Sequence, residues 1–153
     1  MRSAYRKRRV HLPPGIQNFK PGGIPRKLLK KIIITVDEFE AFRLADYKGL
    51  SHLEAAQKMD ISRPTFTRLI EKVRHKVSQA LVDGMELQVE GGNVEFTHAL
   101  YRCLDCGEMQ INLHDVVIGD CPECGSKNIE DMAGNWLELN NRNRNKKRGK
   151  KHE

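Results

Sequence analysis

The alternation of apolar and polar residues divides the chain into segments with different patterns. Residues 32–84 carry apolar positions at helical spacing, interrupted by short polar turns. Residues 85–100 contain alternating apolar and polar positions around a Gly-Gly-Asn turn, which predicts a β-hairpin connector. Residues 1–31 show no helical period and are rich in proline and glycine, which predicts an extended arm or an irregular loop.

Two capping boxes set the register of the helical segment. In each, a hydroxyl side chain, at Thr35 and at Ser51, stands three positions before a glutamate. The boxes predict one helix over residues 36–47 and a second over residues 52–59. Acidic residues in the first turn of the first helix are interpreted as partners of the helix dipole.

A third helix is predicted to begin after Ser62 and to end at Gly84. Asp60 stands where the chain must turn sharply, and aspartate tolerates positive φ. Pro64 suits the first helical turn, although a residue before proline avoids the α region, so Arg63 is an alternative boundary. The apolar stripe of this helix is Phe66, Leu69, Ile70, Val73, Val77, Ala80 and Leu81.

A short helix, a tight turn and a helix with a polar outer face predict a helix-turn-helix. In that motif the second helix enters the DNA major groove and its first residues reach base edges, where arginine can bind guanine bidentately. The alternative is a three-helix bundle whose charged face is only solvated. The predicted DNA contacts from the third helix are Ser62, Arg63, Thr65, Thr67, Arg68 and Lys72.

The blocks "RKRRVHLPP", "FKPGGIP", "DEFEAFRLAD", "GLSHLEAAQKM" and "ISRPTF" resemble an uncharacterised prokaryotic family whose members are described as DNA-binding proteins. The helical segment is similar to region four of bacterial sigma factors. The resemblance covers about residues 5–90 and implies a sigma-region-four-like fold with duplex DNA as partner. By that analogy Arg63, Thr67 and Arg68 take groove-facing positions. The chain departs from sigma factors at Pro64 and Thr65, where those proteins usually have more basic residues or glutamine.

The net charge of +7 is unevenly distributed. Residues 1–31 hold ten Lys/Arg and no acid, whereas residues 85–141 hold two Lys/Arg and eleven Asp/Glu. A basic arm can lie along phosphates or enter the minor groove, although a solubilising tail is the alternative. Residues 140–153 are predicted to form a disordered basic tail. The predicted DNA contacts from the arm are Arg6, Lys7, Arg8 and Arg9.

Four cysteines form two C-x-x-C pairs separated by fourteen residues, and glycine follows each pair. This spacing predicts one structural Zn²⁺ in a small β zinc-ribbon-like module over residues 101–139. Iron and a redox dithiol are alternatives. His114 is predicted to be a surface residue, and Trp136 either packs against the module or anchors an interface. The predicted metal ligands are Cys103, Cys106, Cys121 and Cys124.

The fold class that follows is a mainly α helix-turn-helix domain over residues 32–84, joined to the β zinc ribbon. No secretory signal or membrane span is recognised, so a cytoplasmic protein is expected. We find no catalytic constellation and expect a non-enzymatic transcriptional regulator that binds double-stranded DNA, with a homodimer as a possible state. A protein adaptor of the transcription machinery and a metal or redox sensor are the alternatives.

Overall fold

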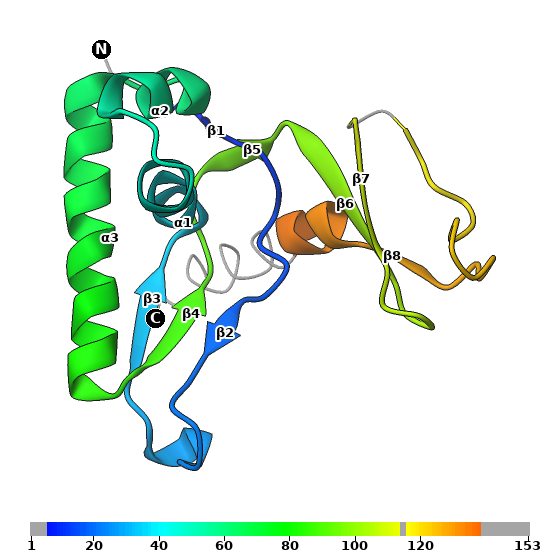
Figure 1. Ribbon diagram of the computed structural model, residues 1–153, viewed down its shortest axis with the longest axis horizontal. Coiled ribbons are helices and arrows are strands. Elements are labelled where there is room, and N and C mark those ends of the chain that lie inside the picture. Colours follow the sequence, from blue (N-terminus) through cyan, green and yellow to red (C-terminus); the bar gives the residue numbers. More distant parts are fainter. Residues whose placement is uncertain (1–5, 114–115, 139–153) are drawn as a thin grey trace, which may run out of the picture. The chain divides into compact units, whose positions relative to one another are not determined.

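The computed structural model describes residues 6–113 and 116–138, and it divides into two compact units (Figure 1). Unit 1 comprises Met1–Val10 and Pro14–Glu95, and unit 2 comprises His11–Pro13 and Phe96–Glu153. The predicted basic tail and His114 lie outside the described residues. Within the described ranges, no helix has the length and apolar character needed to cross a membrane.

Four helical segments follow one another between residues 36 and 83 of unit 1, with the longest at one side (Figure 1). Helix α1 spans Val36–Phe42 and continues into the π-helical turn η2, Arg43–Tyr47. Helix α2 spans His52–Met59, and α3 spans Arg63–Asp83. These bounds agree with the helices that the capping residues and the apolar spacing predict.

The two predicted capping boxes differ in completeness. At Ser51 both halves form, because the serine hydroxyl accepts from the Glu54 N–H and the Glu54 carboxylate accepts from the Ser51 N–H. At Thr35 only the hydroxyl side forms, with the Glu38 N–H as donor at 3.4 Å. The Glu38 carboxylate instead binds the Lys76 ammonium of α3, at 2.9 and 3.0 Å, so the full box predicted there is wrong.

The connection between α2 and α3 has the predicted sharp geometry. Asp60 adopts the left-handed conformation, with φ 56° and ψ 45°. Ser62 is the N-cap of α3 and accepts a hydrogen bond from the Thr65 N–H, so the helix begins at Arg63 with Pro64 in its first turn. Proline fits there because the first N–H groups of a helix have no intrahelical acceptor.

The core of unit 1 lies where the helices meet. Phe66, Ile70 and Val73 of α3 are fully buried against Met59 of α2 and other apolar residues. Leu81, which the stripe placed in the core, is 77 % exposed, so that prediction is wrong. Helix α3 is much longer than α1 or α2. An apolar stripe shows which face of a helix can be buried, but it does not show how far along the helix other elements cover that face.

The basic N-terminal segment is not a free arm in its described part. It forms strand β1 (Arg8–Val10), strand β2 (Asn18–Phe19) and the 3₁₀ turn η1 (Arg26–Leu28). Strand β2 pairs antiparallel with β4 (Glu86–Val89), and β4 pairs in parallel with β3 (Lys31–Ile34) on its other side. The predicted irregular loop therefore contributes a strand to the sheet of unit 1.

The β-hairpin predicted over residues 85–100 is absent, because β4 and β5 (Val94–Phe96) lie in different sheets. Strand β5 pairs with β1 instead. Alternation identifies half-buried strands, but it does not choose their partners. The turn between them, with φ 76° at Gly91 and 107° at Gly92, binds α1 through a hydrogen bond from the Val36 N–H to the Gly91 carbonyl.

Unit 2 contains an antiparallel sheet in the order β7-β6-β8. Its strands are β6 (His98–Cys103), β7 (Met109–Leu113) and β8 (Ile129–Asp131). Residues 132–138 are helical. Trp136 on this helix is only 4 % exposed, so the packing interpretation fits it better than an exposed interface anchor.

We expect Gly92→Ala to destabilise unit 1 by about 1–3 kcal/mol, because a positive φ is strained for other residues. The added Cβ would also lie 2.9 Å from Asp37 Oδ1. Gly22→Ala is the matched control, since nothing lies within 4 Å of its Cβ position. Urea unfolding followed by far-ultraviolet circular dichroism measures the difference. Equal stability of the two variants would contradict the prediction.

Candidate functional site

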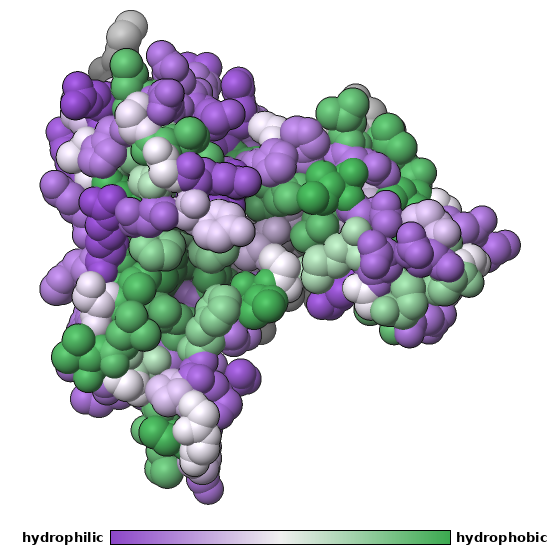
Figure 2. All heavy atoms as spheres, viewed as in Figure 1, coloured by the Kyte–Doolittle hydropathy of each residue, from purple (hydrophilic) through white to green (hydrophobic). Residues whose placement is uncertain are grey.

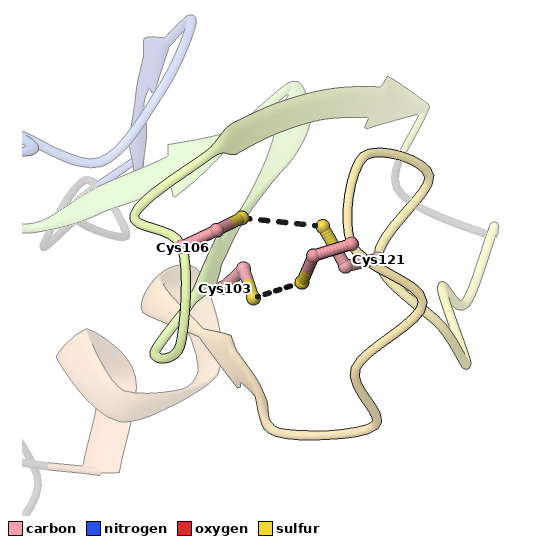
Figure 3. A group of neighbouring side chains, drawn as sticks. Cys103, Cys106 and Cys121 are labelled. Atoms are coloured by element: carbon pink, nitrogen blue, oxygen red, sulfur yellow. Dashed lines mark hydrogen bonds between the residues drawn. The ribbon is translucent and has the colours of Figure 1, made fainter.

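The structure brings the four predicted metal ligands together. The sulfur atoms of Cys103, Cys106, Cys121 and Cys124 all lie within 4.8 Å of one another. Figure 3 shows the labelled side chains converging from two turns. The sulfur atoms of Cys103 and Cys124 lie 3.6 Å apart, and so do those of Cys106 and Cys121. A tetrahedral zinc ion with Zn–S bonds of about 2.3 Å requires S–S separations of about 3.8 Å. The cluster fits such an ion.

Two similar turns position the thiols. The Gly107 N–H donates to the Cys103 carbonyl at 3.0 Å, and the Gly125 N–H donates to the Cys121 carbonyl at 2.8 Å. Both glycines have positive φ, 79° and 72°, which explains why glycine follows each cysteine pair. The backbone amides that these turns expose are the groups that stabilise thiolates.

Hydrogen bonds and crowding separate the acidities of the thiols. The Cys106 backbone N–H donates to Cys103 and is the main reason that its pKa falls to about 7. The Glu108 amide acts in the same direction on Cys106, but burial and the neighbouring sulfurs outweigh it and raise its pKa to about 12. The pKa of Cys124 is raised because Cys103 and burial outweigh the Ser126 amide. A divalent cation would relieve this crowding of negative charge.

A polar tie between the two cysteine turns was missed by the sequence analysis. The Ser126 hydroxyl, in the second turn, donates to the Asp105 carboxylate in the first. The Asn128 N–H donates to Ser126 Oγ at 3.0 Å. The hydrogen bond from Ser126 is the main reason that the pKa of Asp105 is lowered. These residues hold the two turns together around the cluster. Polar residues are common in turns, so nothing in the sequence singled out these three.

The predicted contacts on α3 separate into exposed and engaged residues. Arg63, Arg68 and Lys72 are exposed and form no ion pair within the described part of the chain. Ser62 is also exposed, but its hydroxyl donates to Thr65 Oγ1 at 2.8 Å. The free cations of α3 are therefore the groups available to an anion.

Thr67 faces α2 rather than standing free. Its Oγ1 lies 2.9 Å from Nδ1 of His52, and the His52 ring meets Phe66 edge-on with centroids 5.4 Å apart. The hydroxyl thus joins α2 to α3. By analogy with sigma factors, Thr67 was predicted to face the DNA groove. In the structure its hydroxyl helps to fix the angle between α2 and α3.

A groove of about 390 Å³ adjoins the exposed face of α3. Thr65, Arg68 and Lys72 line one wall, and Arg8 of β1 reaches it from the N-terminal segment. Asn93 lines it from the turn before β5. Predicted contacts that are far apart in the sequence therefore share one surface.

The basic N-terminal segment is fastened to the helices by two of its arginines. The Arg8 guanidinium binds the Asp37 carboxylate of α1 at 2.5 Å, and Arg6 binds Asp60 in the turn before α3 at 2.6 Å. Lys7 and Arg9 are exposed. Arg6 and Arg8 therefore hold the segment in place, and Lys7 and Arg9, which alternate with them, remain at the surface.

Three acidic residues in α1 are buried, which the helix-dipole interpretation did not anticipate. Each has a cation within 3 Å, and only one of these cations comes from the next turn of the same helix. Buried carboxylates need such partners because unpaired burial of a charge is costly. The pairs are Asp37 with Arg8, Glu38 with Lys76 and Glu40 with Arg43.

A family profile described as "Protein of unknown function DUF134" matches residues 2–97. The chain belongs to the DUF134 family. This match extends over unit 1 and so includes the groove and the basic segment. No solved structure matches the chain.

Several similar proteins carry the name UPF0251 protein. That of Chloroherpeton thalassium is 52 % identical over 125 residues, which cover 82 % of this chain and 83 % of its own. That of Desulforudis audaxviator is 43 % identical over 123 residues, 80 % of each chain. That of Moorella thermoacetica is 39 % identical over 127 residues, 83 % of each chain. These matches are longer than the DUF134 profile and therefore reach into unit 2.

We expect zinc binding to release protons at pH 7, because coordinated thiols must be deprotonated and the pKa values of Cys106 and Cys124 are raised in the free cluster. Affinity should fall as the pH falls through 7, since protons then compete at Cys103 as well. Calorimetry in buffers of different ionisation enthalpy measures the release.

The matched variant for this measurement is Cys103→Ser, which removes one thiolate and should abolish binding of one zinc ion per chain. Far-ultraviolet circular dichroism should still report the helices of unit 1. Unchanged zinc stoichiometry in this variant would contradict the four-thiolate site.

Proposed function

We propose that this DUF134 protein is a non-enzymatic transcriptional regulator that binds duplex DNA, with one structural zinc ion on its four cysteines. Helix α2, the Asp60 turn and α3 would act as a helix-turn-helix, the motif that the sequence analysis expected. The observation that carries the proposal is that Arg68 and Lys72, exposed and unpaired cations of α3, line one groove together with Arg8 of the basic strand.

The exposed face of α3 suits a major groove. Arg68 and Lys72 are four residues apart, so they lie on the same side of α3, about 6 Å apart along its axis. The DNA major groove is about 12 Å wide and admits a helix, so an inserted α3 can present Arg68 to base edges while Lys72 meets a phosphate. Thr65 and the hydroxyl of Ser62 add polar groups at the helix start.

The ion pairs of the N-terminal segment support the same proposal. Because Arg6 and Arg8 are already bound to carboxylates, the segment needs less ordering when a ligand arrives. Lys7 and Arg9, the sequence neighbours of Arg8, stay exposed, so their charges remain available to phosphate. We assign phosphate contacts to these two residues and a positioning role to Arg6 and Arg8.

The acidic composition around unit 2 supports assigning DNA binding to α3 and the N-terminal segment and not to the cysteine module. Residues 85–141 carry eleven acidic and two basic residues, and four thiolates with one Zn²⁺ would add two negative charges. Such a surface repels phosphate. A site with four thiolates also leaves no open metal position, so its role would be structural.

Selection of bound duplexes from a random pool at near-physiological salt tests the proposal directly. We expect an enriched motif, and Arg68→Ala should relax preference within it by about 1–3 kcal/mol at one position. Lys72→Ala should weaken binding to all duplexes alike and lower the salt dependence by about one unit.

Lys27→Ala is the control for charge alone, because Lys27 is an exposed lysine on η1 that lines no part of the groove. It should leave the motif and the affinity nearly unchanged. An absence of any enriched motif would sink the regulator and leave the adaptor interpretation, in which the same face contacts a protein.

A further inference from the structure

Strand β7 of unit 2 presents an apolar edge that nothing in the proposed function uses. It is the outer strand of the β7-β6-β8 sheet, and no described strand pairs with its other side. Met109, Ile111 and Leu113 point to one face and are 43 %, 54 % and 66 % exposed. Figure 2 shows hydrophobic atoms at the surface over β7 and the segment after it.

This edge lacks the features that normally prevent strands from pairing. Soluble proteins protect outer strands with charged side chains, proline, bulges or a very short length. Strand β7 reads Met-Gln-Ile-Asn-Leu, with five residues, no charge, no proline and no glycine. The rest of the segment around it is acidic, so the absence of charge within β7 is a local property.

The strand is complementary to itself in one antiparallel register. A two-fold axis through Ile111 places Ile111 opposite its own copy and Met109 opposite Leu113, which gives apolar pairs on one face. On the other face Gln110 meets Asn112, and their amides can exchange hydrogen bonds. This register pairs all five residues, and no like charges stand opposite each other.

We propose that a second copy of this chain docks on β7, so that the sheets of the two unit 2 modules join edge to edge. An isologous contact of this kind is what a two-fold dimer requires. The inference rests on unit 2 alone and does not depend on DNA binding. It gives the four-cysteine module a role as the dimerisation element.

Charge gives this interface a characteristic salt response. The strands themselves are neutral, and each unit 2, over residues 96–153, holds nine acidic and nine basic residues. Association of the two copies should therefore change little as ionic strength rises. DNA binding weakens as ionic strength rises, which separates the two phenomena.

The decisive experiment uses two charged variants of the residue on the axis. In Ile111→Lys and in Ile111→Glu, each copy would face its own like charge, so we expect each variant to dimerise at least about tenfold more weakly than the parent protein. Mixing the two variants places opposite charges at the axis and should restore a heterodimer. Sedimentation equilibrium of the full chain at 0.1 and 0.5 M salt measures all of these states.

Leu104→Lys is the matched control, because Leu104 is also 54 % exposed and lies in unit 2 but outside β7. It should dimerise like the parent protein. Circular dichroism and zinc content confirm that each variant is folded. A monomer at all concentrations, or a dimer that Ile111→Lys does not weaken, would overturn the proposal.

Discussion

The burial of carboxylates at the start of α1 is the constraint on which the arrangement of unit 1 depends. Asp37 and Glu38 are almost inaccessible to water, so each requires a cation brought from elsewhere in the chain. Arg8 supplies one from β1, and Lys76 supplies the other from the middle of α3. Removing one partner of a buried pair costs roughly 3–5 kcal/mol, which is a large part of the stability of a small domain. These pairs therefore set the walls of the groove.

The same constraint changes the meaning of the basic composition. Lysine and arginine counts treat every cation as available to an anion, yet Arg6, Arg8 and Lys76 are already neutralised by carboxylates within the fold. The charges left free at the surface are fewer, and they include Arg68 and Lys72 of α3 and Lys7 and Arg9 of the N-terminal segment. If the protein binds DNA as proposed, its preference for a sequence would come from the geometry of the groove-lining residues. The net charge would contribute mainly to the rate at which protein and DNA meet.

The features predicted correctly from the sequence have local causes. The helix caps, the left-handed Asp60 and the glycines of the cysteine turns each depend on a few consecutive residues. The errors concern partners that are distant in the chain. Alternation could not reveal that β4 pairs with β2 and β3, and the stripe on α3 could not reveal that Leu81 extends beyond its neighbours. The clustering of the four cysteines could be predicted from their spacing. The carboxylate partners of Arg6 and Arg8 could not be predicted, because they are distant in the sequence.

The position of β4 at the centre of its sheet has a consequence for how the chain folds during synthesis. The three helices make mostly local contacts, and they can form as soon as residues up to Asp83 are available. Strand β3 and strand β2, however, have no partner until residues 86–89 are made. Until then the nascent chain exposes two unpaired strands beside a nearly finished helical layer. The helical segment predicted over residues 32–84 therefore lies beside a sheet that only the following strand, β4, completes.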